Sequence, residues 1–186
     1  MRSDKERIYD AYLAAAARTG DRGALSILAK RWHPKLLRHA WRLTGDPDMA
    51  ADIVQDAWID ILKGIRGLRN TQAFAAWAFR VVTRRTTRSY ERRQRRQETA
   101  EAYARQDENV PIEPDRNECL SDLEKVQKLI AELPPKQRAA IGLFYLEDLR
   151  VAEVSVALGV PPGTIKTRLM HARARLRELI EGERNE

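Results

Sequence analysis

The organisation of the chain is set by residues 133–180, which read LPPKQRAAIGLFYLEDLRVAEVSVALGVPPGTIKTRLMHARARLRELI. This stretch contains three helical patterns. The first spans about 135–146 and the second 151–158, each with apolar residues at helical spacing. Gly159 follows as a turn residue that can adopt a positive φ, and two prolines then open a third helix. Helix, tight glycine turn and helix is the layout of a helix-turn-helix, whose second helix enters the major groove of DNA.

The third of these helices has one apolar face and one face that suits DNA. Its apolar residues recur every three or four positions, namely Ile165, Leu169, Ala172, Leu176 and Leu179. The opposite side carries small, hydrogen-bonding and cationic residues, the types that contact base edges and phosphates. We predict DNA contacts from Thr164, Lys166, Thr167, Arg168, Met170, His171 and Arg175. A solvated cationic face is the alternative, and the glycine turn with its preceding helices favours DNA binding over it.

This segment resembles the C-terminal domain of bacterial sigma factors, especially the short extracytoplasmic-function (ECF) class of the sigma-70 family. The resemblance rests on the motif LPPKQR, on the helical pattern of 149–159 and on the run GTIKTRLMHARARLR. A helix-turn-helix alone is shared with many response regulators. Whether the likeness extends to the whole chain therefore depends on its first half.

Length and composition restrict the classes of protein to consider. The 186 residues suffice for one or two small domains, and the formal net charge of +7 favours a polyanionic partner. The single cysteine cannot form an intramolecular disulfide, and no Cys/His cluster, catalytic triad or phosphate-binding glycine loop is present in the sequence. No apolar run is long enough to insert into a membrane or to form the core of a signal peptide. We therefore expect a cytoplasmic protein that has no metal, no cofactor and no catalytic activity.

Charge divides the chain into three parts. Residues 1–96 hold 21 Lys and Arg against 10 Asp and Glu, residues 97–132 hold 4 against 10, and residues 133–186 hold 9 against 7. The polar, acidic stretch 97–117 contains two prolines, which predicts a flexible linker. We therefore predict an all-α protein in which this linker joins two small helical domains, an N-terminal domain at 1–96 and a C-terminal helix-turn-helix domain at 118–186.

Turn and capping residues predict where the first helices begin and end. Thr19 and Gly20 should end the first helix, and Asp21 can cap the second. Within the second helix, Pro34 predicts a break or a kink. The histidines on either side of this proline, His33 and His39, lack a third metal ligand, and we interpret them as structural or solvated.

The helix predicted for 48–65 has an unusual polar face. Acidic residues at positions 48, 52 and 56 follow i,i+4 spacing, at which like charges repel, and an isoleucine lies among them. An acidic stripe around an apolar side chain indicates a docking surface for a basic partner. Its members are Asp48, Asp52, Gln55, Asp56, Ile59 and Lys63. A solvated helix face is one alternative, and a magnesium site at Asp52 and Asp56 is another, although magnesium would require a second carboxylate-bearing element or a phosphate.

The region after this helix is glycine-containing and then strongly cationic. Residues 63–71 include two glycines and are predicted to form a loop, and Thr71 can cap the next helix. That helix begins apolar and then carries seven arginines between Arg84 and Arg96. Charges at this density repel one another unless an anion lies beside them, so nucleic acid is the expected neutraliser. A solvated basic tail is the alternative.

The runs DPDMAADIVQDAWIDILKGI (46–65) and FAAWAFRVV (74–82) resemble the other conserved domain of the sigma factors. The resemblance implies that Asp52, Gln55 and Asp56 dock on the coiled coil of the largest subunit of core RNA polymerase. It also implies that the loop 64–72 and the following helix capture the melted downstream promoter strand, while the helix-turn-helix binds the upstream element. We assign the downstream contacts to Arg66, Arg69, Asn70, Arg80, Arg84, Arg85 and Arg88.

The two motifs occur in the order found in sigma factors, and the chain is identified from its sequence as a member of the ECF class. Such a protein binds core RNA polymerase, directs it to specific promoters and helps to open promoter DNA. The expected partners are core RNA polymerase, promoter DNA and an anti-sigma protein. A free-standing helix-turn-helix regulator is the main alternative, and it leaves the acidic helix and the arginine-rich helix unexplained. A decoy for an anti-sigma protein and a nucleic-acid enzyme with a metal at Asp52 and Asp56 are further alternatives.

Overall fold

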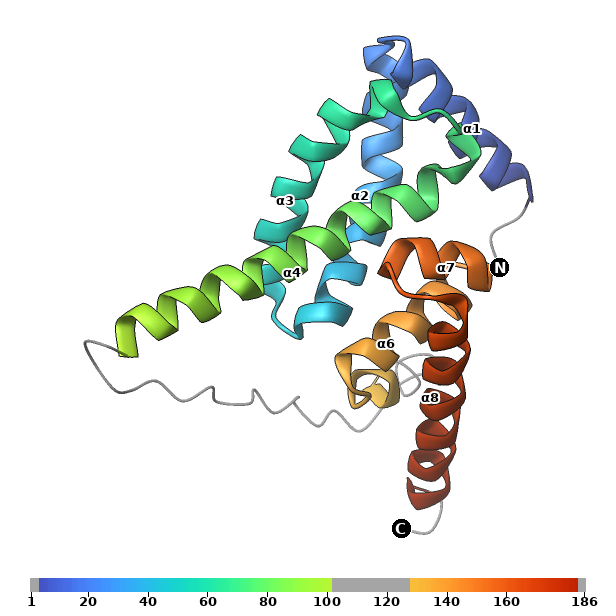
Figure 1. Cartoon of the computed structure of the whole chain (residues 1–186). Coiled ribbons are helices and arrows are strands. Elements are labelled where there is room, and N and C mark those ends of the chain that lie inside the picture. The colour runs from blue at the N-terminus through green and yellow to red at the C-terminus, as the bar shows by residue number, and fades with distance from the viewer. Residues whose placement is uncertain (1–3, 102–127, 184–186) are drawn as a thin grey trace.

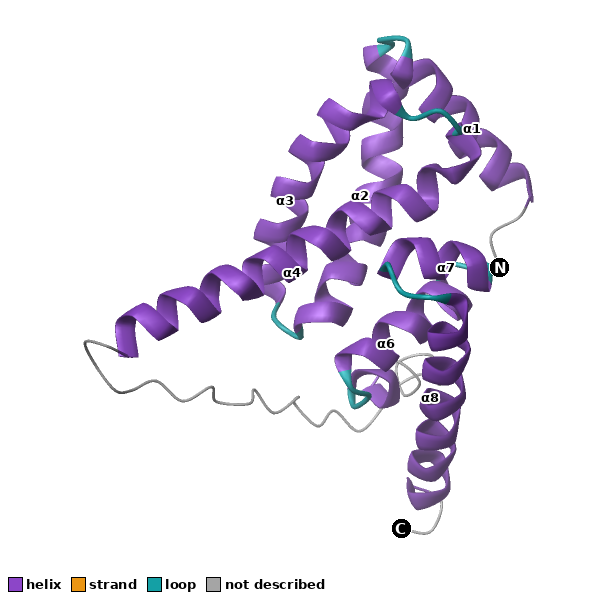
Figure 2. Cartoon of the chain, in the orientation of Figure 1, coloured by secondary structure: helices purple, strands orange, loops and turns teal. Residues whose placement is uncertain are grey.

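The computed structural model describes residues 4–101 and 128–183, and within these ranges every regular element is helical (Figure 1 and Figure 2). The N-terminal domain consists of α1 (Asp4–Arg18), α2 (Arg22–Thr44), α3 (Pro47–Gly64), the 3-10 turns η1 (Ile65–Gly67) and η2 (Thr71–Ala73), and α4 (Phe74–Glu101). The C-terminal domain contains α6 (Pro135–Ile141), the π-helical turn η3 (Gly142–Leu146), α7 (Val151–Leu158) and α8 (Pro162–Glu183). The predicted all-α fold of two helical domains is confirmed. None of the helices in the described ranges is long and apolar enough to cross a membrane.

Side-chain caps fix the starts of α2 and α3. The Asp21 carboxylate accepts a hydrogen bond from the backbone N–H of Ala24 at 3.0 Å, which confirms the predicted cap of α2. Asp46 caps α3 in the same way, through the N–H of Met49 at 2.9 Å. Between these two helices, Gly45 adopts φ 74°, a conformation that ends α2 at little steric cost. The short turn between Thr44 and Pro47 makes α2 and α3 antiparallel neighbours.

Helix α2 continues through Pro34, so of the break or kink predicted there, the break is wrong. A proline inside a helix removes one backbone hydrogen bond and crowds the preceding turn. Here the helix is held on both sides of the proline by core side chains, since Leu28 and Trp32 before it and Leu36 after it are all fully buried. The burial of these large side chains offsets the lost hydrogen bond.

Trp32 lies at the centre of the N-terminal core. Its ring packs edge-on against Phe74 and Phe79 of α4, with ring centroids 5.1 Å and 5.5 Å away. Edge-to-face aromatic pairs at such distances stabilise a core beyond the area that they bury. The apolar face predicted for α3 covers the other side of this core, with Ala50, Ile53, Val54, Ala57 and Ile61 buried.

The helix-turn-helix forms as the sequence indicates. Gly159 follows α7 with φ 64°, and its N–H donates to the carbonyl of Ser155 at 2.8 Å. Helix α8 then begins at Pro162, and Ile165, Leu169 and Ala172 on its apolar stripe are buried. The pattern of 135–146 forms α6 and then a π-helical turn rather than one helix.

Two predicted boundaries fall at the limits of the described residues. Helix α4 continues to Glu101, so it includes the first residues of the predicted linker 97–117. The rest of that linker and the predicted start of the C-terminal domain at 118 lie outside the described residues.

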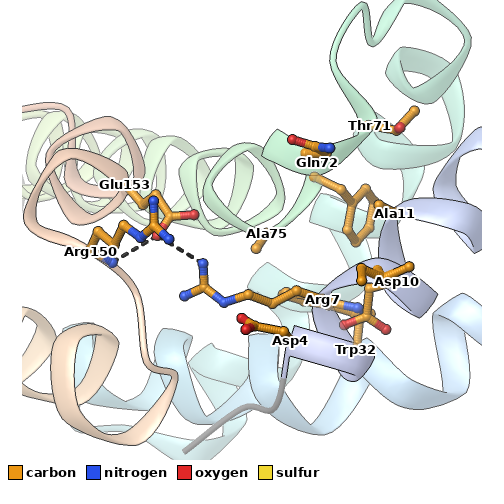
Figure 3. Close-up of a pocket in the computed structure, with 12 residues that line it drawn as sticks. Asp4, Arg7, Asp10, Ala11, Trp32, Thr71, Gln72, Ala75, Arg150 and Glu153 are labelled. Atoms are coloured by element: carbon orange, nitrogen blue, oxygen red, sulfur yellow. Dashed lines mark hydrogen bonds and ion pairs between the residues drawn. The ribbon is translucent and has the colours of Figure 1, made fainter.

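The two domains pack against each other. Helix α7 lies across the first half of α4, and α6 lies against α2 (Figure 1). A cavity of about 510 Å³ remains between α1, the start of α4 and α7, and Arg7 extends through it toward Glu153 (Figure 3). This packing brings both predicted DNA-binding regions close to the boundary between the domains.

His39 of α2 is fully buried, and its hydrogen bond identifies which ring nitrogen carries the proton. Its Nε2 lies 3.0 Å from the hydroxyl oxygen of Thr83, and that hydroxyl donates its only hydrogen to the carbonyl of Phe79, also at 3.0 Å. The imidazole must therefore donate from Nε2. Desolvation by burial, and secondarily the charge of Arg42, lower the pKa of His39 to about 3. This histidine is a neutral structural residue, as we interpreted it.

The buried histidine predicts a pH dependence of stability. An unfolded chain protonates His39 near pH 6.5, whereas the folded chain keeps it neutral down to about pH 3. The unfolded state therefore binds the extra proton, and the free energy of unfolding should fall by up to about 1.4 kcal/mol per pH unit as the pH drops through this window. His39→Gln, which retains a donor for Thr83, should lack this contribution. Urea unfolding of both proteins at a series of pH values checks the prediction, and parallel pH profiles would contradict it.

Candidate polymerase and nucleic-acid interfaces

The six residues predicted for polymerase docking share one exposed surface of α3, which we call the α3 outer face. Asp48, Asp52, Gln55, Asp56, Ile59 and Lys63 are all exposed, and Ile59 has 45% of its surface accessible. They share this surface because the opposite side of the helix is buried in the core. A stripe of carboxylates therefore shares this surface with an accessible apolar side chain.

A shallow apolar groove adjoins the α3 outer face, and sequence patterns did not predict it. It has a volume of about 490 Å³, and Pro34, Trp58 and Leu62 contribute to its lining. The Trp58 indole donates to Nδ1 of His33 at 3.2 Å, which orients the tryptophan ring between α2 and α3. His33 is therefore also structural, and Pro34 helps to shape a surface.

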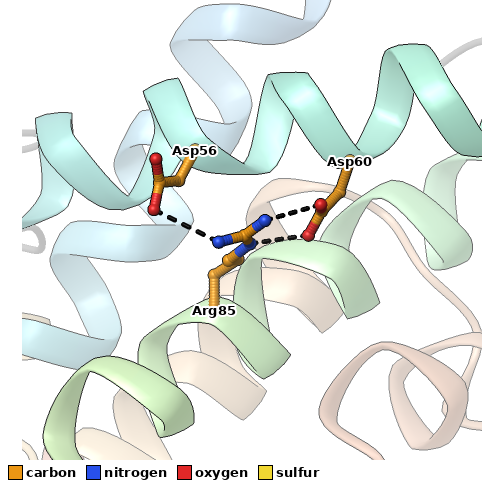
Figure 4. Close-up of polar contacts among 3 residues, drawn as sticks. All are labelled: Asp56, Asp60 and Arg85. Atoms are coloured by element: carbon orange, nitrogen blue, oxygen red, sulfur yellow. Dashed lines mark hydrogen bonds and ion pairs between the residues drawn. The ribbon is translucent and has the colours of Figure 1, made fainter. Parts of the chain in front are cut away.

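Arg85, which we predicted to contact DNA, is bound to carboxylates of α3 (Figure 4). Its guanidinium makes two parallel hydrogen bonds to Asp60, at 2.6 Å and 2.5 Å, and a third to Asp56 at 3.2 Å. The hydrogen bond from Arg85 lowers the pKa of Asp60 below its usual value. Arg85 thus links α4 to α3. Asp60 was absent from our predicted set, although it continues the acidic spacing of 48, 52 and 56.

Of the other predicted downstream-DNA residues, four are exposed cations. Arg66 and Arg69 are exposed around η1, and Arg84 and Arg88 are exposed on α4. Asn70, another member of the set, makes a contact within the protein. Its side chain caps η2 by accepting a hydrogen bond from the N–H of Gln72 at 3.0 Å. Four cations of the set are therefore available to an anionic ligand.

Arg80 faces the C-terminal domain rather than open solvent. It is half-buried, and its guanidinium fills the space above Gly159. A Cβ atom built on Gly159 would lie 1.5 Å from Nη1 of Arg80, far closer than any non-bonded contact. The glycine therefore permits this approach between α4 and the helix-turn-helix.

The predicted upstream-DNA residues lie along α8, opposite its buried stripe. Lys166, Thr167, Met170, His171 and Arg175 are exposed, and Thr164 is half-buried. Arg175 is paired with Glu178 at 3.0 Å, and an exposed pair of this kind contributes little and can yield to a phosphate.

Arg168 differs from the other members of the upstream set. It lines a cleft of about 380 Å³ between the domains, together with Thr83 and Thr87 of α4. Desolvation by burial lowers the pKa of its guanidinium, which nevertheless stays charged. Two predicted DNA contacts, Arg80 and Arg168, thus lie at the domain boundary.

The described residues contain no cluster of three or more His, Cys, Asp or Glu side chains that could hold a metal ion. At the position of the alternative magnesium site, Asp56 is paired with Arg85.

Comparison with known proteins identifies both domains. The family description "Sigma-70 region 2" matches residues 28–96, and "Sigma-70, region 4" matches residues 123–176. The ECF RNA polymerase sigma factor SigM of Mycobacterium tuberculosis is 33% identical over 171 residues, which cover 92% of this chain and 84% of SigM. The ECF RNA polymerase sigma-E factor of Haemophilus influenzae is 28% identical, with 96% of both chains covered.

Solved structures agree with these sequence relationships. The sigma factor RpoE of Bartonella quintana, determined in complex with the anti-sigma factor NepR, has a TM-score of 0.67 and 26% identity, covering 84% of this chain and 96% of RpoE. CnrH, determined with the cytosolic domain of CnrY, shares the fold with a TM-score of 0.64 and 23% identity, covering 94% of this chain and 98% of CnrH. On these matches and on its two helical domains, the chain belongs to the ECF RNA polymerase sigma factors of the sigma-70 family.

Proposed function

We propose that this sigma factor docks on core RNA polymerase through the α3 outer face and binds promoter DNA through two separate surfaces. One surface consists of the η1 turn with the exposed arginines of α4, and the other is the exposed side of α8. The observation that carries the proposal is the exposed carboxylate stripe around Ile59 in a chain of formal net charge +7. The partner is the coiled coil of the polymerase's largest subunit, which would present basic residues to this stripe.

The downstream surface is suited to single-stranded DNA. Arg66 lies in η1 and Arg69 between η1 and η2, whereas Arg84 and Arg88 follow on α4, so cations border both an irregular and a regular segment. Proteins hold unpaired strands with cationic grooves that follow the backbone and with pockets for unstacked bases. Helping to open DNA in this way requires binding groups and no catalytic side chain.

The upstream surface is suited to a major groove. Near the start of α8, Lys166, Thr167 and Met170 lie farthest from the buried stripe, which is where a recognition helix meets base edges. Arg175 lies two to three turns further along, in a position for a phosphate. The two ends of α8 therefore have different proposed roles.

An anti-sigma protein is a further proposed partner. RpoE of Bartonella quintana has a similar fold and was determined with its anti-sigma factor NepR bound. The exposed α3 outer face and its apolar groove offer such a protein a surface that polymerase would also use. Competition between the two ligands would follow.

The first prediction from the proposed function concerns docking. Asp48→Lys combined with Asp52→Lys should weaken binding to core RNA polymerase at least about tenfold, because the reversed charges would face a basic partner. Both positions are exposed and lie outside the Arg85 ion pairs, so the fold should persist.

Asp4→Lys combined with Glu132→Lys provides the control, since it changes the net charge equally at exposed carboxylates outside α3. Titration of labelled core polymerase with each purified variant measures the effect. If both variants bind as tightly as the unchanged chain, the docking assignment is wrong.

The second prediction separates base contacts from phosphate contacts on α8. Lys166→Ala should change which bases are preferred at one or two positions of the upstream element, with a discrimination of about 1–3 kcal/mol lost there. Arg175→Ala should weaken binding to all sequences alike and reduce the salt slope by about 0.9. Selection from a randomised promoter library with the polymerase holoenzyme at two salt concentrations makes the comparison. A change in base preference caused by Arg175→Ala and not by Lys166→Ala would reverse the proposed placement of α8.

The third prediction tests the role of Arg85. Arg85→Ala removes three hydrogen bonds between α4 and α3 and should reduce the free energy of unfolding by about 1 kcal/mol. Arg84→Ala, its exposed neighbour, should leave stability within about 0.5 kcal/mol and weaken binding to forked DNA instead. Urea unfolding and forked-DNA titrations of the two variants are the measurements. Equal free energies of unfolding would show that Arg85 does not stabilise the packing of α4 on α3.

A further inference from the structure

The cleft of about 380 Å³ beside Arg168 is lined by both apolar and polar side chains. Residues of α4, α6 and α8 line it, and the positions of these helices can be followed in Figure 1. Part of its wall is apolar and consists of Leu43, Ala139, Leu158 and Val160. Clefts of about 300–1,000 Å³ with apolar walls and a few polar groups are typical of small-molecule sites. This cleft lies at the small end of that range.

Two cations line the cleft, and no carboxylate accompanies them. They are Lys136 in the first turn of α6 and Arg168 on α8, and none of the described residues that line the cleft is an aspartate or a glutamate. Lys136 is exposed, whereas Arg168 is half-buried. A cation that is partly removed from water and has no carboxylate beside it is stabilised by an anion from outside the chain. The cleft is therefore suited to a ligand with an anionic group.

The α4 side of the cleft presents hydrogen-bond acceptors. The hydroxyl of Thr86 donates its hydrogen to the backbone carbonyl of Val82 at 3.0 Å. The hydroxyl of Thr87 donates in the same way to the carbonyl of Thr83 at 3.1 Å. Each hydroxyl oxygen still has lone pairs that can accept a hydrogen bond. The cleft thus combines two cations with acceptors, which suits a molecule that carries both an anionic group and N–H groups.

Tyr90 gives the cleft an aromatic surface. The residue is 44% exposed, and its hydroxyl donates a hydrogen bond to the carbonyl of Thr44 at 3.3 Å. This hydrogen bond holds the tyrosine side chain at the end of α2. An accessible aromatic ring of this kind stacks with planar groups, and nucleobases stack on such rings whatever their sequence.

We propose that this cleft binds a purine mononucleotide, with the phosphate between Lys136 and Arg168 and the base stacked on Tyr90. A phosphate monoester carries a charge of about −1.5 to −2 at pH 7, which matches two cations. A base with an amino group, such as adenine, supplies hydrogen-bond donors to the hydroxyl oxygens of Thr86 and Thr87. A nucleic-acid strand fits less well, because the described lining residues provide no cations for further phosphates. The site is separate from the α3 outer face and does not depend on the proposed function.

Isothermal titration calorimetry of the full chain tests whether both parts of the ligand are recognised. The probes are adenosine 5′-monophosphate, adenosine and inorganic phosphate, each at low salt. The monophosphate should bind at least about tenfold more tightly than either fragment, because it alone joins the base to the anion. A monophosphate that binds no more tightly than inorganic phosphate would overturn the proposal.

A charge variant tests the two cations. Lys136→Ala combined with Arg168→Ala should weaken binding of adenosine 5′-monophosphate at least about tenfold. The matched control is Lys5→Ala combined with Arg22→Ala, which also removes one lysine and one arginine, both exposed and outside the cleft. The control should bind the nucleotide as tightly as the unaltered chain. Equal losses in the two variants would indicate attraction by net charge alone and would overturn the site.

Variants of Tyr90 test the stacking of the base. Tyr90→Ala should weaken binding of adenosine 5′-monophosphate at least about fivefold and leave binding of inorganic phosphate unchanged. Tyr90→Phe keeps the ring and should stay within about threefold of the unaltered chain. Far-UV circular dichroism checks that each variant keeps its helical fold. Unchanged nucleotide binding in Tyr90→Ala, or equal losses in both variants, would contradict stacking on the ring.

Photolabelling tests the location of the site. Irradiation with 8-azidoadenosine 5′-monophosphate, followed by peptide mapping, should place the label in residues 83–92 or 135–139. An excess of adenosine 5′-monophosphate should prevent the labelling. Label found only in other segments would place the nucleotide elsewhere and overturn the proposal.

A single-stranded deoxyadenosine hexamer tests the nucleic-acid alternative. Its affinity is measured with the unaltered chain and with the variant that lacks both cations of the cleft. The loss of affinity caused by this variant should be smaller for the hexamer than for adenosine 5′-monophosphate. A larger loss for the hexamer would identify a strand as the ligand of the cleft and overturn the assignment to a mononucleotide.

Discussion

The packing of Trp32 against Phe74 and Phe79 is the interaction on which the N-terminal domain depends. The three rings join α2 to the start of α4, although more than forty residues separate them along the chain. This contact therefore brings together the two helices between which α3 and the two 3-10 turns lie in the chain. Since α3 has its own apolar side against the same core, its polar side must face outward. The proposed docking surface is thus a consequence of how the core is filled.

Helical periodicity explains how much of the fold and of the candidate site could be predicted. For α3 and α8 the spacing of apolar residues determines the buried side, and the burial of Ile61 and Leu169 agrees with it. The opposite side of each helix must then be exposed, and most candidate binding residues lie on that side. Gly159 and Asp21 were equally predictable, because a positive φ and a helix cap are local requirements.

Contacts made by long side chains across elements could not be predicted in this way. Arg85 and Arg84 are adjacent in sequence and alike in composition, yet one binds Asp60 and the other is exposed. The same holds for Arg42 and Glu147, whose pairing depends on the relative position of two domains. Periodicity says which side of a helix is buried and nothing about which partner a guanidinium reaches. The helix break predicted at Pro34 was wrong for a related reason. The burial of neighbouring side chains outweighs the tendency of proline to end a helix.

The environment of Gly159 has a consequence for substitutions at this position. Its φ of 64° alone would still admit asparagine, a residue that adopts the left-handed conformation at modest cost. The guanidinium of Arg80 adds a second requirement, because a Cβ atom at this position would lie 1.5 Å from Nη1 of Arg80 and the arginine would have to move. The residue is thus subject to two separate requirements, one from the turn and one from the neighbouring domain. An asparagine tolerated by the isolated turn would therefore displace Arg80 in the assembled chain, so the cost of the substitution would fall on α4 as well as on the turn.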